Sequence, residues 1–158
     1  MPKECFIRPY ELSDIPFIVD TVACHVPTLP TYKNIAVSKP RIEYLLKHNY
    51  GNASYFQCWV LIDKETKQLV GGSAGYCTPG MLTTDLVAND VFLFVLPEWR
   101  TLRHCTMCMI AYREWAKARG AKLINATQTS GYRMEQFDMV MRRQGYVETG
   151  KHWMLRMD

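Results

Sequence analysis

The chain has 158 residues, of which 48% are apolar and 22% charged, and its formal net charge is +4. This length is typical of a single domain, here residues 1–158, that buries its own hydrophobic core, and the composition is that of an ordinary globular protein. The sequence contains no run of 18 apolar residues, which excludes a membrane-spanning helix. The polar N-terminus lacks the apolar stretch of a signal peptide, so we expect a cytoplasmic protein. The mild positive charge permits an anionic ligand but does not by itself imply nucleic acid.

Six cysteines raise the question of disulfides or a metal site. Five of them lie in apolar or helical segments, where a reduced thiol acts as a small hydrophobic side chain. Cys105 and Cys108 have C-x-x-C spacing and follow His104, but no second Cys/His pair occurs that would complete a zinc site. We therefore expect no bound metal.

The N-terminal third predicts a short strand followed by two helices. Residues 5–10 form the strand, and Ser13 is the expected cap of a helix that carries Pro16 in its first turn and runs to about residue 24. Residues 25–38 contain two prolines and no periodicity, which indicates a loop. Ser38 is the expected cap of a second helix that ends near His48.

The central part predicts three antiparallel strands. Residues 55–62 and 68–76 flank a polar turn, the pattern of a β-hairpin. Three glycines in the second of these strands indicate a bulge or a close backbone approach. Residues 87–96 form a long, nearly continuous apolar run, typical of a strand buried on both faces.

The C-terminal part alternates helices and strands. We expect helices at residues 104–119 and 134–143, a strand at 122–127, and a final strand pair at 146–149 and 152–157. The helix at 104–119 connects two strands as a β-α-β crossover, which makes those strands parallel. The predicted fold is α+β: a mixed, mostly antiparallel sheet of six or seven strands with a central parallel pair, flanked by about four helices.

Residues 95–106 lead from the long strand into a helix and could bind a phosphate group. The first amides of a helix are unpaired and lie at the positive end of its dipole. Arg100 and Arg103 add positive charge, and Thr106 could add a hydroxyl donor. The alternative is an ordinary strand-to-helix turn with solvated arginines.

The same stretch carries a family resemblance. DVFLFVLPEWR resembles the fourth strand and acyl-CoA loop of the GNAT superfamily of N-acyltransferases, with Val95, Pro97 and Arg100 at matching positions. IRPYELSDI, REWAKARGAKLI and MRRQGYVETGKHWMLRM resemble other parts of the family in the same order along the chain. Thr101, Arg103 and Cys105 stand where the family prefers small residues, mostly glycines, a departure similar to that of divergent, phage-like members. Arg103 could replace a backbone contact by a charged one, or it could obstruct the pocket.

The resemblance implies an acetyl-CoA-dependent N-acetyltransferase in which a primary amine attacks the thioester directly. Backbone N–H groups at Val95 and Leu96 would polarise the thioester carbonyl. The resemblance places acetyl-CoA against Val95, Leu96, Arg100, Thr101, Leu102, Arg103, His104, Cys105 and Thr106.

The residues for proton transfer are less well defined. The carboxylate that many relatives carry early in the fourth strand aligns with Asn89, which cannot accept a proton, so the neighbouring Asp90 is the better base. A bulge in this strand would turn Asp90 toward the cleft, and an apolar environment would raise its pKa. The alternative is that Asp90 caps or pairs near the start of the strand. Met141 replaces the tyrosine that often serves as acid, which leaves Tyr132, Tyr146 or a water molecule.

For the acceptor, the resemblance points to residues 25–39, with Tyr32, and 77–85, with Cys77. Neither segment has the acidic cluster expected for a polycationic amine. Two other functions remain open: an inactive binding module with this fold, or a nucleic-acid-associated protein using the basic residues. The acceptor and the oligomeric state, a homodimer included, are not defined by the sequence.

Overall fold

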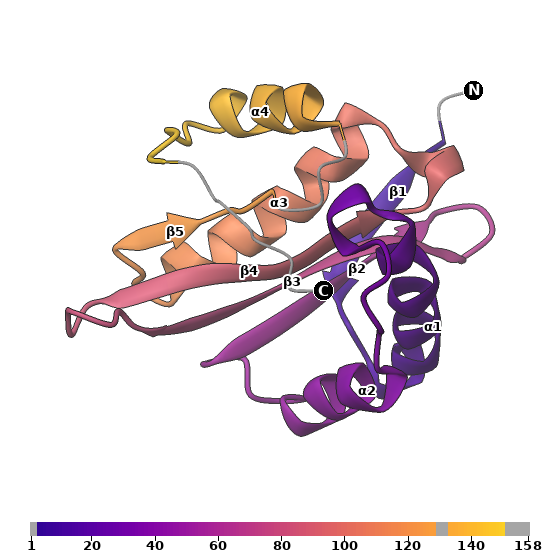
Figure 1. Ribbon diagram of the computed structural model, residues 1–158, viewed down its shortest axis with the longest axis horizontal. Helices are drawn as coiled ribbons and strands as arrows, with labels where there is room; N and C mark the ends of the chain where they lie inside the picture. The colour runs from indigo at the N-terminus through magenta and orange to yellow at the C-terminus, as the bar shows by residue number, and fades with distance from the viewer. Residues whose placement is uncertain (1–2, 129–132, 151–158) are drawn as a thin grey trace.

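The computed structural model describes residues 3–128 and 133–150, which form a sheet with helices on both faces (Figure 1). Short 3-10 turns accompany these elements at Leu12–Asp14, Val26–Thr28, Pro30–Tyr32 and Pro97–Trp99. The strands and helices are β1 (Cys5–Pro9), α1 (Ile15–His25), α2 (Lys39–His48), β2 (Phe56–Asp63), β3 (Leu69–Pro79), β4 (Leu86–Val95), α3 (Leu102–Ala118), β5 (Leu123–Asn125) and α4 (Met134–Arg143).

The strands are ordered β1-β2-β3-β4-β5, with antiparallel pairing from β1 to β4 and parallel pairing between β4 and β5. This confirms the predicted α+β class and the parallel pair joined through α3. The described residues form five strands, fewer than the six or seven expected. Residues 146–149 are described and form no strand, whereas the expected strand at 152–157 lies outside the described residues.

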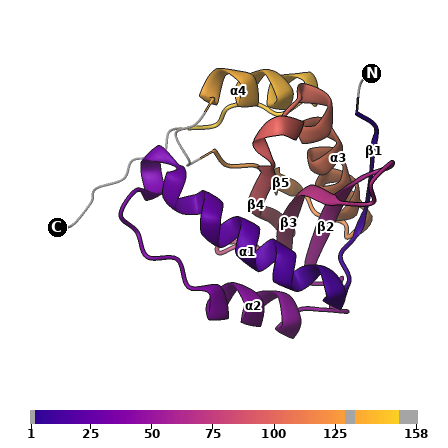
Figure 2. The same ribbon diagram turned by 90° about the vertical axis from the view of Figure 1, so that its right-hand side faces the viewer.

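The two faces of the sheet carry different helices, α1 and α2 on one side and α3 and α4 on the other (Figure 2). Consecutive residues of a strand point to opposite faces, so β2 contributes to two cores. Cys58 packs with α1 and α2, and its neighbour Trp59 packs with α3 and α4. We refer to these as the α1/α2 face and the α3/α4 face. In the described part of the chain, no helix has the length and hydrophobicity needed to cross a membrane.

Helix starts follow local capping, with two differences from the prediction. Ser38 caps α2 as expected, accepting a hydrogen bond from the Arg41 amide. Ser13 does not cap α1, because it lies within a 3-10 turn that extends the helical path upstream, and α1 begins after Asp14. Helix α3 begins at Leu102 rather than at residue 104, because the Thr101 hydroxyl accepts a hydrogen bond from the amide three residues later at 3.1 Å.

The glycines of β3 allow close approach, as their position in the sequence indicates. A Cβ on Gly72 would lie 2.5 Å from the carbonyl oxygen of Trp59 on the neighbouring strand. A Cβ on Gly75 would lie 2.4 Å from the ring of Tyr112, which therefore packs directly on the β3 backbone. This contact brings α3 close to the sheet at the point where β4 and β5 separate.

Candidate active site

The central feature of the site is a fork between β4 and β5. The two strands pair in parallel from Val87 with Leu123 to Asn89 with Asn125. Strand β5 ends at Asn125, whereas β4 continues to Val95. Beyond the last pair, the edge of β4 that faces β5 has no strand partner among the described residues. The fork therefore offers backbone hydrogen-bonding groups to an extended ligand.

Backbone direction decides which amides of β4 face the fork. The Leu96 amide donates to the Val70 carbonyl of β3 at 2.8 Å, so it points away from the fork. Amides of consecutive residues in a strand point to opposite sides, which turns the Val95 amide toward the fork. The Val95 carbonyl also lies on this side and accepts a hydrogen bond from Arg100 Nε at 2.8 Å. Of the two backbone positions expected from the sequence, only Val95 presents its amide to the fork.

A bulge in β4 sets the direction of its polar side chains. Phe92 is opposite Ala74, whereas Asp90 is opposite Gly75, so Val91 is the extra residue. Without the bulge, Asp90 would share the face of Phe92, which packs with α1 and α2. With it, Asp90 turns to the α3/α4 face and Asn89 turns to the α1/α2 face.

These two side chains link the strands across the vertex of the fork. On the α3/α4 face, Asp90 Oδ1 accepts hydrogen bonds from the Thr127 amide and hydroxyl, both at 3.0 Å. On the α1/α2 face, Asn89 Oδ1 accepts a hydrogen bond from Asn125 Nδ2 at 2.9 Å. The alternative expected for Asp90 was a pairing role near the start of the strand, and its hydrogen bonds with Thr127 are contacts of this kind. Burial raises the pKa of Asp90 above its ordinary value, and the Thr127 hydrogen bonds oppose that shift.

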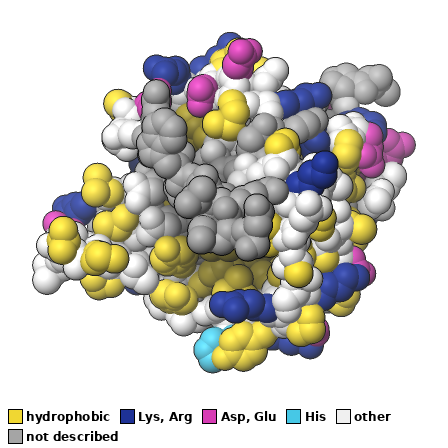
Figure 3. Space-filling view, viewed as in Figure 1, with side chains coloured by type: hydrophobic (Ala, Val, Ile, Leu, Met, Phe, Trp, Pro, Cys, Tyr) yellow, Lys and Arg dark blue, Asp and Glu magenta, His cyan; other side chains and the backbone are white. Residues whose placement is uncertain are grey.

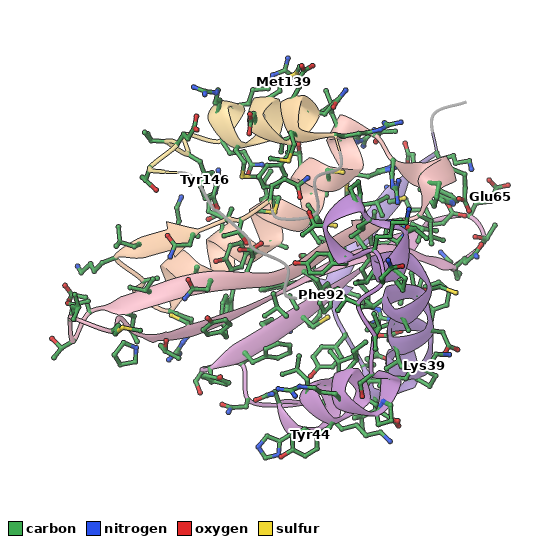
Figure 4. All side chains as sticks on the ribbon, in the orientation of Figure 1. Lys39, Tyr44, Glu65, Phe92, Met139 and Tyr146 are labelled. Atoms are coloured by element: carbon green, nitrogen blue, oxygen red, sulfur yellow. The ribbon has the colours of Figure 1, made fainter. Side chains whose placement is uncertain are left out.

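Two tyrosines lie near Asp90. Tyr112 of α3 donates its hydroxyl proton to the Asn125 carbonyl at 2.7 Å and fills the α3/α4 side of the vertex. The Tyr146 hydroxyl is buried and has no hydrogen-bond partner among the described residues. Burial raises the pKa of both phenols, and the charge of Asp90 contributes in each case. Tyr146 also borders an open hollow together with Asn125 and Thr127, between β5 and α4, and Figure 4 shows it in this region.

The start of α3 lies next to the end of β4. Thr101 caps the helix, and Leu102 and Arg103 in its first turn are exposed. His104 is 3% exposed, with Nδ1 donating to the Trp99 carbonyl at 2.6 Å and Nε2 lying 3.3 Å from the Lys3 carbonyl. The His104 ring is thus part of the structural framework, and its amide is already bonded to Thr101.

The other polar residues of this junction are partly buried. Burial raises the pKa of the Cys105 thiol, and Thr106 is also partly buried within α3. Arg100 Nη2 donates to His25 Nε2 at 2.6 Å, so its guanidinium connects the end of β4 with the last residue of α1. Burial and the charge of Arg100 lower the pKa of His25, which favours its neutral, accepting form.

The two residues expected to contact the acceptor differ in their surroundings. Tyr32 is partly buried on the connection between α1 and α2. Cys77 belongs to β3, which extends to Pro79, and is not in a loop. Its side chain is 4% exposed and packs with Ala88 and Tyr112 on the α3/α4 face, so it reaches no open surface.

Sequence reasoning missed the residues that close the vertex. Tyr112, Asn125 and Thr127 act here through contacts between segments that are distant in sequence. Gly75 in an otherwise apolar strand was a signal that something packs closely, but it did not identify Tyr112 as the neighbour. Within the described ranges, no group of three His, Cys, Asp or Glu side chains is placed to bind a metal.

No protein-family model and no curated protein matches the sequence. Solved structures do match its fold. An acetyltransferase of Trypanosoma brucei superposes with a TM-score of 0.72 at 12% identity, covering 98% of this chain and 100% of the other. A predicted acetyltransferase of Clostridium acetobutylicum, solved with acetyl-CoA, gives 0.73 at 14% identity, covering 97% and 96%. Glucosamine-6-phosphate N-acetyltransferase of Arabidopsis thaliana gives 0.71 at 10% identity, covering 99% and 100%.

These similarities define the class of fold. The chain has the α+β fold of GNAT-type acetyltransferases over nearly its whole length. At identities of 10–14%, the similarity shows the fold alone and leaves substrate and activity to the chemistry of the site.

Proposed function

We propose that this protein is an N-acetyltransferase that transfers the acetyl group of acetyl-CoA to a primary amine. The observation that carries the proposal is the β4–β5 fork, which lies beside the start of α3 and presents the Val95 amide on its open edge. The fold shared with acetyltransferases supports the same function.

The fork and the helix would bind different parts of the cosubstrate. The exposed first turn of α3 offers amides to the diphosphate, and Arg103 adds a positive charge there. The pantetheine arm would lie along the open edge of β4 and hydrogen-bond to Val95. Arg100 already donates to the Val95 carbonyl, so an extended ligand that bonds to this oxygen would share it with the guanidinium or displace the guanidinium.

The reaction then needs a base and an acid. The amine nitrogen attacks the thioester carbon to form a tetrahedral intermediate. The oxyanion of this intermediate accepts a hydrogen bond from the Val95 amide. Asp90 takes the proton lost by the amine, and its raised pKa suits this role. Collapse of the intermediate breaks the C–S bond and releases the CoA thiolate, which takes up a proton. Tyr146 is our candidate donor, because its hydroxyl is buried and has no partner among the described residues.

Cosubstrate binding is tested by calorimetric titration with acetyl-CoA. We expect Arg103→Ala to weaken binding by about tenfold, the loss of one charge-assisted contact. Lys47→Ala is the matched control, since Lys47 is an exposed cation on α2. Equal affinity of the wild-type protein and Arg103→Ala would remove Arg103 from the site, and no binding by the wild-type protein would contradict the proposed function.

Turnover is tested by thiol release from acetyl-CoA in the presence of a panel of amines. We expect Asp90→Asn to lower kcat by about 100-fold or more while the affinity for acetyl-CoA stays unchanged. Binding of acetyl-CoA without thiol release for any amine would instead indicate an inactive binding module with this fold.

A further inference from the structure

On the α1/α2 face of the sheet, the described residues that β3 and β4 carry beyond the two helices are uncharged and partly aromatic. Cross-strand pairing places Tyr76 opposite Asn89, Thr78 opposite Val87, and Ala74 opposite Phe92, so the two strands share this face. Tyr76 and Phe92 are only partly buried where they pack against the core formed with α1 and α2. We call Tyr55, Tyr76, Phe92 and Asn89 the aromatic surface.

Aromatic contacts give this surface its shape. The rings of Tyr55 and Tyr76 lie 6.2 Å apart, and those of Phe92 and Phe94 lie 5.8 Å apart. Tyr55 is 41% exposed. Phe92 lies over the middle of the sheet in Figure 4, and Figure 3 shows hydrophobic side chains just below the centre of the same view. The rings could hold the apolar body of a ligand and place its end near Asn89.

The position of this surface relative to the fork follows from the bulge. Asn89 is the last residue of β4 that pairs with β5, and it belongs to the aromatic surface. Helix α3, where we place the cosubstrate diphosphate, covers the opposite face. A thioester that enters the fork from the α3/α4 face leaves the α1/α2 face as the approach for the amine. This step rests on the proposed function.

Charge decides which amines this surface favours. Residues 26–38, which connect α1 and α2, contain Lys33 and no acidic residue, and the hairpin residues 80–85 contain one acidic residue, Asp85. A polyamine or an aminoglycoside would bring several cationic groups to a surface with few carboxylates, and desolvating an unpaired cation costs several kcal/mol. Aromatic rings, in contrast, bind apolar bodies and attract a single ammonium group through their faces.

We propose that the acceptor is a primary amine on an uncharged aromatic or apolar body, such as an arylalkylamine, which packs its body on Tyr76 and Phe92. Its amino group then lies at the vertex beside Asn89, on the face opposite the Asp90 carboxylate, so the proton that it loses must reach Asp90 through the fork.

The test compares kcat/KM for 2-phenylethylamine and for spermidine in the thiol-release assay. We expect the arylalkylamine to be preferred by about tenfold or more. Phe92→Leu and Tyr76→Leu should raise its KM by about tenfold, from lost aromatic packing. Their affinity for acetyl-CoA and their circular dichroism should match the wild-type protein. Tyr44→Leu is the control, because Tyr44 is a 64% exposed ring on α2 outside the aromatic surface.

The outcomes separate the two proposals. A preference for spermidine, or an unchanged KM in both ring variants, would overturn the acceptor class and leave the acetyltransferase in place. If acetyl-CoA binds but no amine causes thiol release, the proposed function fails and the acceptor class fails with it.

Discussion

Replacing Gly75 by alanine should destabilise the protein through one side chain, Tyr112. A Cβ at this position would lie 2.4 and 2.6 Å from two ring atoms of Tyr112, and 3.1 Å from the Asn89 carbonyl oxygen. Tyr112 is 1% exposed, so its ring has no free space to move into. Overpacking of a core costs about 1–3 kcal/mol, and losing the Tyr112 hydrogen bond to Asn125 costs about 1 kcal/mol more. The lower backbone entropy of unfolded alanine offsets about 0.5 kcal/mol.

The expected net loss is about 1.5–3.5 kcal/mol, which for a chain of this size lowers Tm by about 3–14 °C. Urea unfolding monitored by circular dichroism measures the free energy, and Gly150→Ala is the control, since its Cβ would meet nothing within 4 Å. In a Tyr112→Leu background, Gly75→Ala should cost at least about 1 kcal/mol less than in the wild-type protein. An equal cost in both backgrounds, or a wild-type-like Gly75→Ala protein, would refute the close packing of α3 on β3.

Two further predictions concern the cap of α3 and the vertex of the fork. Thr101→Ala should lower the free energy of unfolding by about 1 kcal/mol, and Thr101→Ser should keep the wild-type value, as measured by thermal unfolding. If α3 started at residue 104, neither change would alter the stability. Burial raises the pKa of Asp90, so the folded state binds its proton more tightly than the unfolded state, and the ionised carboxylate costs stability as pH rises through the folded-state pKa. Asp90→Asn keeps an oxygen for Thr127, and it should gain stability relative to the wild-type protein in urea unfolding as pH rises from about 4 to about 7; a pH-independent difference would contradict a buried, ionisable Asp90.

Much of the fold could be predicted because local patterns specify it. The apolar run of β4 and the alternation around α3 predicted the parallel pair correctly, and Ser38 marked the start of α2. Local patterns predicted the start of α1 less well, because two possible caps lie close together there. Glu11 and Asp14 form reciprocal hydrogen bonds across a 3-10 turn, which moves the start of α1 beyond Ser13.

The candidate site was harder to predict because it depends on pairing register. Asn89 and Asp90 are adjacent in sequence, and only the extra residue Val91 decides which face each one reaches. The direction of the Leu96 amide is likewise set by its partner on β3, which the sequence does not show. The family resemblance placed Cys77 in the loop between the third and fourth strands, yet β3 continues to Pro79.

The two links at the vertex, Asn89 with Asn125 and Asp90 with Thr127, determine how far apart the strands can lie before any ligand arrives. The Thr127 amide is already bonded to Asp90, so pairing it with the β4 backbone would break that link. Moving the two strands further apart at the vertex would break both links. A molecule that enters the fork therefore meets a preorganised opening, and little of its binding energy is lost to ordering the protein.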